Sequence, residues 1–108
     1  MNDPFHVTVR HVGPGVYEVS VAGELDVATA PELRTALGQA MAGCRQVTID
    51  LAGLEFCDCC GMSTLLHAAR TAKAEGSEIR LRAVPHTLAR LLRLFRTDSA
   101  FTIEPPDP

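Results

Sequence analysis

One stretch of sequence decides the fold: residues 47–66, which read VTIDLAGLEFCDCCGMSTLL. Apolar and polar residues alternate at its start, which is the period of a β-strand. The middle, 52–58, is expected to form a loop ending on Asp58, a residue type that commonly caps a first helical turn. A helix then begins near Cys59 and ends at Gly76. Its apolar side consists of Met62, Leu65, Leu66, Ala69 and Ala72.

Two further strands are predicted before this stretch. Apolar residues alternate with polar residues over 5–9 and again over 17–21. Gly13-Pro14-Gly15 lies between them and predicts a turn, so we expect the two strands to form a hairpin. Residues 23–26 are expected to leave the second strand.

A first helix is predicted at Thr29-Ala30-Pro31-Glu32, where a threonine and an acid three residues later have the spacing of a capping box. Proline is tolerated in a first turn because its missing N–H would have no partner there. Apolar residues continue at helical spacing, and Gly43 is expected to end the helix. These apolar residues are Leu33, Ala36, Leu37, Ala40 and Met41.

The C-terminal third is predicted to add a strand over 79–83, a helix opened by Pro85, and a short last strand at Phe101 and Ile103. The tail, 104–108, is rich in proline and is expected to be flexible. The apolar side of this third helix is formed by Leu88, Leu91, Leu92 and Phe95.

This order of elements predicts an α/β fold. Strands separated by helices are expected to pair in parallel through right-handed crossovers, and the hairpin makes the sheet mixed. Because every strand alternates in polarity, we expect the helices to pack mainly on one face of the mixed β-sheet. The sequence shows no repeat or long linker, so it predicts a single domain over 1–108 with a core of about 5–103.

The composition excludes several classes of protein. The 108 residues are 46% hydrophobic and 21% charged, which is typical of a globular chain and not of a disordered one. The net charge of −3 argues against a nucleic-acid partner, and no apolar run approaches the ~20 residues of a membrane span. No secretory signal is visible at the start. We expect a cytoplasmic protein that binds neither nucleic acid nor membrane.

The cysteines raise the question of redox chemistry. Cys57, Cys59 and Cys60 are crowded together while Cys44 stands apart, which is unlike a disulfide framework. Cys57 and Cys60 form a C-x-x-C pattern before a helix, where a thiol pKa is commonly lowered. The adjacent charge of Asp58 opposes this lowering. We therefore hold redox control as an alternative hypothesis.

Metal binding and catalysis have weaker support. His67 and the three crowded cysteines lack the two separated ligand pairs of structural zinc sites, so we expect no metal or other cofactor. Ser63 and His67 share one side of the second helix, but no orienting acid or oxyanion hole is evident. We expect that the protein is not an enzyme.

Four pieces of the sequence together resemble the STAS domain of bacterial anti-sigma factor antagonists. They are Gly23-Glu24-Leu25-Asp26, Thr29-Ala30-Pro31-Glu32-Leu33, Ile49-Asp50-Leu51 and Phe56-Cys57-Asp58-Cys59-Cys60-Gly61-Met62. The resemblance extends from about Phe5 to Ile103 and implies a STAS fold.

The resemblance also implies a function. An antagonist of this family docks on an anti-sigma factor of the histidine-kinase-like ATPase class, a serine kinase, and so releases a sigma factor by partner switching. Phosphorylation of a serine at the start of the second helix places about two negative charges in the docking surface and ejects the partner. The residues expected to contact the partner are Asp26, Thr29, Phe56, Cys57, Asp58, Cys59, Cys60, Gly61, Met62, Ser63 and Thr64.

The chain departs from the family pattern at the phosphorylated position. It reads Asp58-Cys59-Cys60-Gly61 where the family usually reads Asp-Ser-Ser-Gly or Asp-Ser-Thr-Gly. Cys59 therefore occupies the phospho-acceptor position, and a thiol is close to a hydroxyl in size but a poor acceptor for a serine kinase. We expect docking without the usual phosphorylation switch. Ser63 and Thr64 are the alternative acceptors in the next turn, but both are ordinary helix residues, so we do not expect them to replace it.

Two alternative functions stay open at this point. One is a redox-responsive STAS switch that acts through Cys57, Cys59 and Cys60. The other is a STAS scaffold or transport-accessory protein whose partner is not an anti-sigma factor. We expect a monomer or a weak dimer under each of these hypotheses.

Overall fold

A computed structural model describes residues 4–104, which form one five-stranded sheet and three α-helices. The elements in chain order are β1 (His6–Gly13), β2 (Val16–Leu25), α1 (Ala30–Met41), β3 (Gln46–Cys57), α2 (Cys59–Ala74), β4 (Glu78–Arg82), α3 (His86–Leu94), the short 3-10 helix η1 (Asp98–Ala100) and β5 (Thr102–Ile103). The strand order is β1-β2-β3-β4-β5, with β1 antiparallel to β2 and all other neighbours parallel. Except for Glu104, the predicted flexible tail lies outside the described residues.

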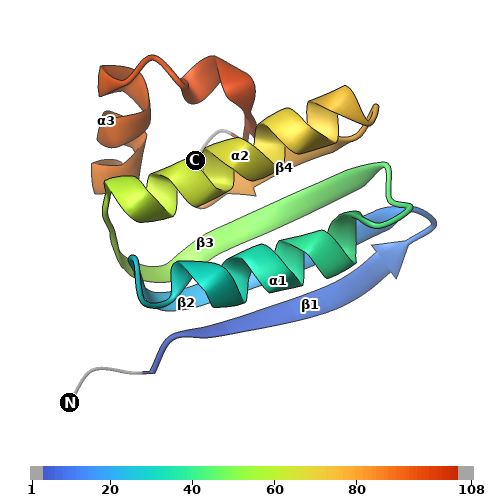
Figure 1. The fold of residues 1–108 in the computed structure, drawn as a ribbon, viewed down its shortest axis with the longest axis horizontal. Helices are drawn as coiled ribbons and strands as arrows, with labels where there is room; N and C mark the ends of the chain where they lie inside the picture. The colour runs from blue at the N-terminus through green and yellow to red at the C-terminus, as the bar shows by residue number, and fades with distance from the viewer. Residues whose placement is uncertain (1–3, 105–108) are drawn as a thin grey trace.

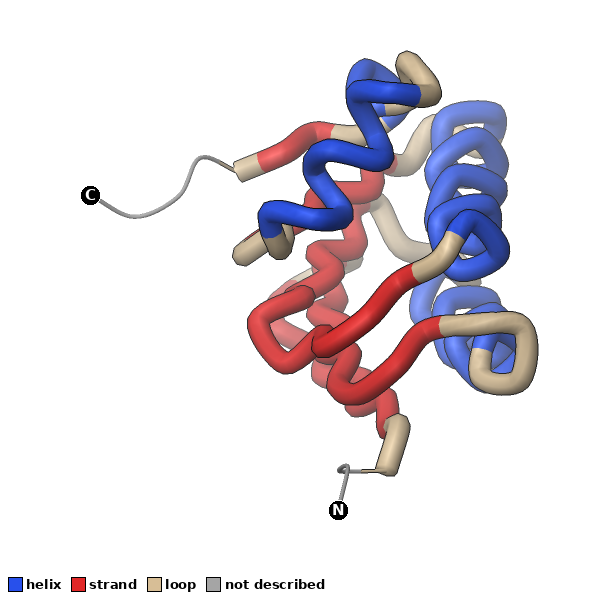
Figure 2. Tube along the Cα trace, turned by 90° about the vertical axis from the view of Figure 1, so that its left-hand side faces the viewer, coloured by secondary structure: helices blue, strands red, loops and turns tan. Residues whose placement is uncertain are grey.

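Helices α1 and α2 cover one face of this sheet (Figure 1, Figure 2), in agreement with the prediction that the helices pack mainly on one face. In Figure 1, α1 and α2 lie side by side across the sheet, and α3 lies beside the first turns of α2. Figure 2 shows the same arrangement from the side, with the strands in one layer and α1 and α2 in the next. The α/β fold with a mixed sheet is therefore confirmed. The core between the layers contains Val19, Val21, Leu33, Leu37, Val47, Ile49, Leu51, Leu65, Ile79 and Leu81.

The opposite face of the sheet carries an ion-pair network. Arg82 donates to Glu18 at 2.7 Å and to Asp50 at 2.9 Å, and Glu18 also accepts from Arg10 at 3.0 Å. Burial raises the pKa of Asp50. The hydrogen bond from the N–H of Ala52 and the nearby Arg82 guanidinium lower this pKa by more, so it lies below its usual value. The network thus links β1, β2, β3 and β4 on the side that the helices leave uncovered.

Two strands are longer than the sequence pattern predicts. Residues 23–26 and 52–58 were expected outside the strands, but β2 continues to Leu25 and β3 continues to Cys57. The pairing of β2 with β3 shifts register twice in this region. Such bulges disrupt the strict alternation of side chains while the strands stay paired. The extension matters because it brings the ends of both strands to the start of α2.

The third helix also differs from its prediction. Leu88 and Leu92 are buried, but Phe95 follows the last residue of α3 and is 55% exposed. The prediction that Phe95 belongs to the buried apolar side of the helix is therefore wrong. Arg96 adopts a left-handed conformation (φ 54°), so the helix ends before Phe95 is part of a further turn. Among the described residues, no helix combines the length and apolar character needed to cross a bilayer.

Candidate functional site

The candidate site lies where the carboxyl ends of β2 and β3 meet the first turn of α2. The register pairs Glu24 with Phe56 and Leu25 with Cys57, so the two strand ends are neighbours. The loop from β2 to α1 and the start of α2 leave the sheet at this same edge, on the left in Figure 1. Nearly all of the residues predicted to contact a partner are therefore brought together in space.

Gly61 allows α2 to start directly against β2. A Cβ at this position would lie 2.7 Å from Leu25 Cγ, 2.8 Å from the Leu25 carbonyl oxygen and 2.9 Å from Cys57 Sγ. Real Cβ atoms do not approach other heavy atoms so closely, so a side chain here would force the helix away from the strand. The absence of a side chain thus sets the position of the helix start.

Asp58 caps α2, as predicted. Its carboxylate accepts a hydrogen bond of 2.9 Å from the backbone N–H of Gly61, and its own N–H donates to the carbonyl of Leu25. The first of these bonds satisfies a donor that has no partner within the helix. Asp58 therefore fixes the loop before α2 to both the helix and the end of β2.

The capping box predicted at Thr29 and Glu32 is wrong. Thr29 has helical dihedral angles and makes no side-chain cap. A reciprocal pair of hydrogen bonds forms one turn earlier instead. Asp26 accepts from the N–H of Thr29 at 3.2 Å, and the Thr29 hydroxyl accepts from the N–H of Asp26 at 2.9 Å. The helical turn starts at Asp26 because Ala30 already donates to its carbonyl, and this closes the loop into a fixed shape.

Exposed apolar side chains flank this edge of the sheet. Phe56 is 50% exposed at the end of β3, and Val27 is 72% exposed in the loop after β2. Val27 was not among the predicted contact residues, although a branched apolar side chain directly after Asp26, in a loop between two elements, was a usable signal. Both side chains are therefore available for contact with a protein partner.

Other predicted contact residues face the interior. Gly61, Met62 and Thr64 are buried, and the Thr64 hydroxyl donates to the carbonyl of Cys60. The side chains of Met62 and Thr64 are therefore turned away from solvent. Ser63 is exposed on the outer side of the same turn.

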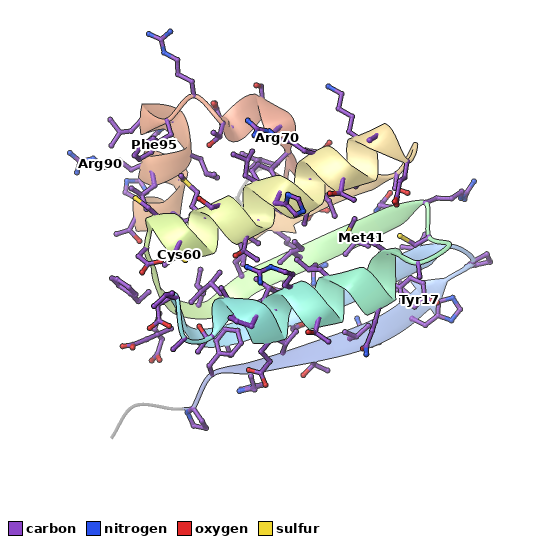
Figure 3. The ribbon with its side chains drawn as sticks, viewed as in Figure 1. Tyr17, Met41, Cys60, Arg70, Arg90 and Phe95 are labelled. Atoms are coloured by element: carbon purple, nitrogen blue, oxygen red, sulfur yellow. The ribbon has the colours of Figure 1, made fainter. Side chains whose placement is uncertain are left out.

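The clustered cysteines have different environments. Cys59 and Cys60 are exposed on the first turn of α2, whereas Cys57 is half-buried (Figure 3 labels Cys60). Burial, with the nearby charge of Asp58, raises the pKa of Cys57 to about 12. Its thiol therefore stays protonated at neutral pH, and a protonated thiol is a poor nucleophile.

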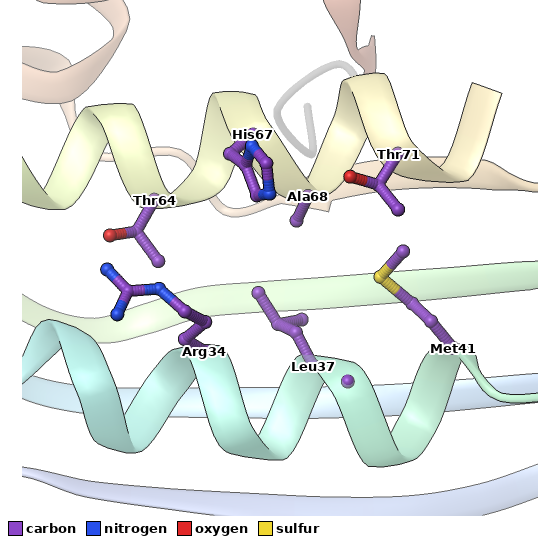
Figure 4. A pocket seen from close by; sticks show the side chains of 8 residues that line it. Arg34, Leu37, Met41, Thr64, His67, Ala68 and Thr71 are labelled. Atoms are coloured by element: carbon purple, nitrogen blue, oxygen red, sulfur yellow. The ribbon is translucent and has the colours of Figure 1, made fainter. Parts of the chain in front are cut away.

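A groove between α1 and α2 continues from this edge. One pocket of about 310 Å³ is lined by Arg34, Cys60, Ser63, Thr64 and His67. A second pocket of about 170 Å³ follows along the helices, with Leu37 and Met41 on one side and Ala68 on the other (Figure 4). The groove is mostly apolar, and Arg34 and His67 border it.

The charges around the strand ends are acidic. Glu24 and Glu55 are exposed, and Asp26 and Asp58 are partly exposed beside Val27 and Phe56. Within residues 4–104, no three histidine, cysteine, aspartate or glutamate side chains gather closely enough to hold a metal ion. The strand ends therefore combine an ordered backbone with exposed apolar and acidic side chains.

Comparison with known proteins gives consistent matches. Residues 12–104 match the family described as "Mlab, STAS domain". The anti-sigma-F factor antagonist RsfA of Mycobacterium tuberculosis is 26% identical over 95 residues, which cover 85% of this chain and 73% of RsfA. The crystal structure of an anti-sigma factor antagonist from Mycobacterium paratuberculosis superposes with a TM-score of 0.82 at 29% identity, covering 94% of this chain and 86% of that one.

The fold is also that of unphosphorylated SpoIIAA, an anti-sigma factor antagonist of Bacillus. The TM-score is 0.77 at 15% identity, and the match covers 94% of this chain and 90% of SpoIIAA. At that level of identity the likeness concerns the fold alone.

Substitution of Gly61 tests the close approach of α2 to β2. We expect Gly61→Ala to lower the free energy of unfolding by about 1–3 kcal/mol, since the new methyl group overlaps Leu25. Urea denaturation followed by circular dichroism measures this change.

Gly38→Ala is the matched control. Gly38 lies within α1 and a Cβ there meets no atom within 4 Å, so alanine is expected to raise the free energy of unfolding by about 0.5–1 kcal/mol. Equal stability of the Gly61→Ala variant and the parent protein would contradict the packing described here.

Proposed function

This chain belongs to the STAS domain family, as the match over residues 12–104 shows, and we propose that it acts as an anti-sigma factor antagonist by docking alone. The relatives that match at 26% and 29% identity are anti-sigma factor antagonists. Such antagonists are regulatory proteins and not enzymes. The role requires a surface that binds a protein partner. It requires no catalytic group.

The observation that carries this proposal is the preformed surface at the start of α2. Val27 and Phe56 are exposed on it, while hydrogen bonds of Asp26, Thr29 and Asp58 hold the surrounding backbone in place. A surface that is already ordered loses little conformational entropy when it binds. The exposed apolar side chains of Val27 and Phe56 contribute affinity when a partner removes them from water.

The charge of this surface favours a basic partner face. Glu24, Asp26, Glu55 and Asp58 lie next to Val27 and Phe56 in the chain or in the strand register, so lysine or arginine on the partner would meet opposite charge. The partner that we propose is an anti-sigma factor of the histidine-kinase-like ATPase class, the class implied by the sequence resemblance. Electrostatic attraction of this kind raises the association rate more than it raises the final affinity.

Cys59 alters how such an antagonist is regulated. It is exposed at the first position of α2, so its environment would suit a phospho-acceptor, but it carries a thiol where a kinase requires a hydroxyl. We propose that this antagonist docks without being switched off at this position. Of the two alternative acceptors, Ser63 is exposed. Thr64 is buried, and its hydroxyl donates a hydrogen bond to the backbone carbonyl of Cys60.

The alternative of redox control through all three cysteines receives less support. The raised pKa of Cys57 leaves it without thiolate character at neutral pH, which counts against a reactive Cys57–Cys60 pair. Cys59 and Cys60 are exposed, but exposure alone does not indicate a redox function.

Removal of the exposed aromatic side chain of Phe56 tests docking. We expect Phe56→Ser to weaken binding of the cognate anti-sigma factor by about tenfold or more, because burial of an aromatic side chain contributes about 1.5–3 kcal/mol. Surface plasmon resonance with the immobilised anti-sigma factor measures the affinity. The control is Val12→Ser, which removes an exposed apolar residue (56% exposed) near the β1–β2 turn and is expected to bind as the parent does. Equal affinity for all three proteins would refute docking through this surface.

Restoring the hydroxyl tests the altered regulation. We expect the parent protein, incubated with its anti-sigma factor and ATP, to acquire no phosphate at Cys59, whereas Cys59→Ser acquires one at residue 59. Mass spectrometry of the digested proteins locates the modification, and Cys60→Ser is the matched control for a serine placed one residue further along. Phosphate on residue 59 of the parent protein would overturn the proposed loss of the switch.

A further inference from the structure

The groove between α1 and α2 has one wall on each helix. Its walls come from residues three to four positions apart, which are Arg34, Leu37 and Met41 on α1 and Thr64, Ala68 and Thr71 on α2. Figure 4 shows these side chains pointing toward one another across the gap between the two helices. Seven residues separate Arg34 from Met41, which corresponds to about 10 Å along the helix axis. The groove is therefore long enough for an extended small molecule.

The two ends of the groove differ in polarity. Near the start of α2, a pocket of about 310 Å³ is lined by polar side chains, among them Arg34, Ser63 and His67. Further along the helices, a pocket of about 170 Å³ is lined mainly by apolar surface, which includes Leu37 and Met41. Arg34 and His67 line both pockets, so the pockets adjoin. The groove thus offers polar groups at one end and apolar surface along the rest.

Arg34 has no ion-pair partner in the described part of the chain. The ion pairs among residues 4–104 involve Arg10, Arg80 and Arg82, and the Arg34 guanidinium takes part in none of them. No aspartate or glutamate lines either pocket. A guanidinium group presents paired N–H donors whose geometry matches the two oxygens of a carboxylate. A carboxylate is therefore the group that complements this end of the groove.

Gly38 keeps the apolar part of the groove open. It lines the smaller pocket, and a Cβ at this position would meet no atom within 4 Å. Two glycines lie within the α-helices that the structure describes, and the other one, Gly61, has a steric reason, since a Cβ there would overlap Leu25. Gly38 has no such reason, and glycine weakens a helix interior relative to alanine. The missing side chain of Gly38 leaves space in the groove instead.

We propose that this groove binds a medium-chain fatty carboxylate. The carboxylate pairs with the Arg34 guanidinium, with the Ser63 hydroxyl and the His67 ring as further donors, and the alkyl chain lies along Leu37 and Met41. The distance of about 10 Å between Arg34 and Met41 matches an extended chain of roughly eight carbons, at about 1.5 Å per bond. Removal of the methylene groups from water supplies the affinity, and the charged end orients the ligand.

A series of ligands tests the charged end and the apolar chain separately. Isothermal titration calorimetry at constant ionic strength, below the concentration at which micelles form, measures binding of butanoate, hexanoate and octanoate to the intact protein. We expect the affinity to rise about tenfold from hexanoate to octanoate, because two further methylene groups leave water. Octanol, which has the chain without the charge, is expected to bind about tenfold more weakly than octanoate.

Variants locate the binding in the groove. Gly38→Leu fills the smaller pocket and is expected to weaken octanoate binding about tenfold or more. Its control is Gln39→Leu, which adds the same side chain at the next, exposed position of α1 and is expected to bind as the parent does.

The charged contact has its own variant and control. Arg34→Gln is expected to weaken octanoate binding about tenfold and to leave octanol binding unchanged, because the alcohol carries no charge for Arg34 to pair with. A merely structural arginine would not distinguish the two ligands in this way. The control, Arg90→Gln, removes an exposed charge from α3 and is expected to bind octanoate as the parent does.

Three outcomes would overturn the proposal. They are the absence of saturable octanoate binding up to about 10 mM, a concentration at which only very weak complexes form, equal affinity for octanoate and octanol, and unchanged affinity in both groove variants. If the parent binds no octanoate and Gly38→Leu weakens binding of the anti-sigma factor, the groove belongs to the protein partner. Octanoate binding is measured without the anti-sigma factor, so its failure leaves the proposed docking function standing.

Discussion

The contact between the first turn of α2 and the end of β2 determines how the rest of this molecule is arranged. Gly61 lies against the carbonyl and side chain of Leu25 with no room for a Cβ. Asp58 joins the same two elements through hydrogen bonds to Gly61 and Leu25. Because protein interiors are close-packed, a helix held so tightly at one end fixes the strand and loop beside it. The strand extensions of β2 and β3 bring that contact to the edge of the sheet.

In the proposed docking role, this constraint lets the surface recognise a partner specifically. The loop from Asp26 to Thr29 is closed by its own reciprocal hydrogen bonds, and the first turn of α2 is capped. Binding energy is therefore available for recognition and is not consumed in ordering the surface. The same rigidity makes the surface sensitive to charge, since a phosphate at the helix start could not move away from a docked partner. In the proposed regulation, the cysteine at position 59 keeps the shape of the surface and lacks the hydroxyl on which that control depends.

Most of the fold follows from local patterns in the sequence. Alternation predicted the strands, and apolar spacing together with Asp58 predicted α2 and its cap. The register shifts between β2 and β3 were not predictable, because pairing to a neighbouring strand maintains a strand after alternation has ended. The cap before α1 was misplaced because Thr29–Glu32 and Asp26–Thr29 have the same spacing, and only the dihedral angles of Thr29 decide between them. The exposure of Phe56 and the left-handed conformation of Arg96 also depend on tertiary contacts that no local pattern records.

The most direct measurement of docking is a map of the contact surface on the intact protein. Amide signals of the isotope-labelled chain are followed by NMR during titration with the unlabelled anti-sigma factor. We predict that the signals that change most lie in the loop around Asp26 and Val27, at Phe56, and on the first turn of α2. The signals of the β1–β2 turn and of the last turn of α2 are predicted to change little. Changes concentrated on the uncovered face of the sheet around Glu18 and Arg82, with none at the start of α2, would contradict the account.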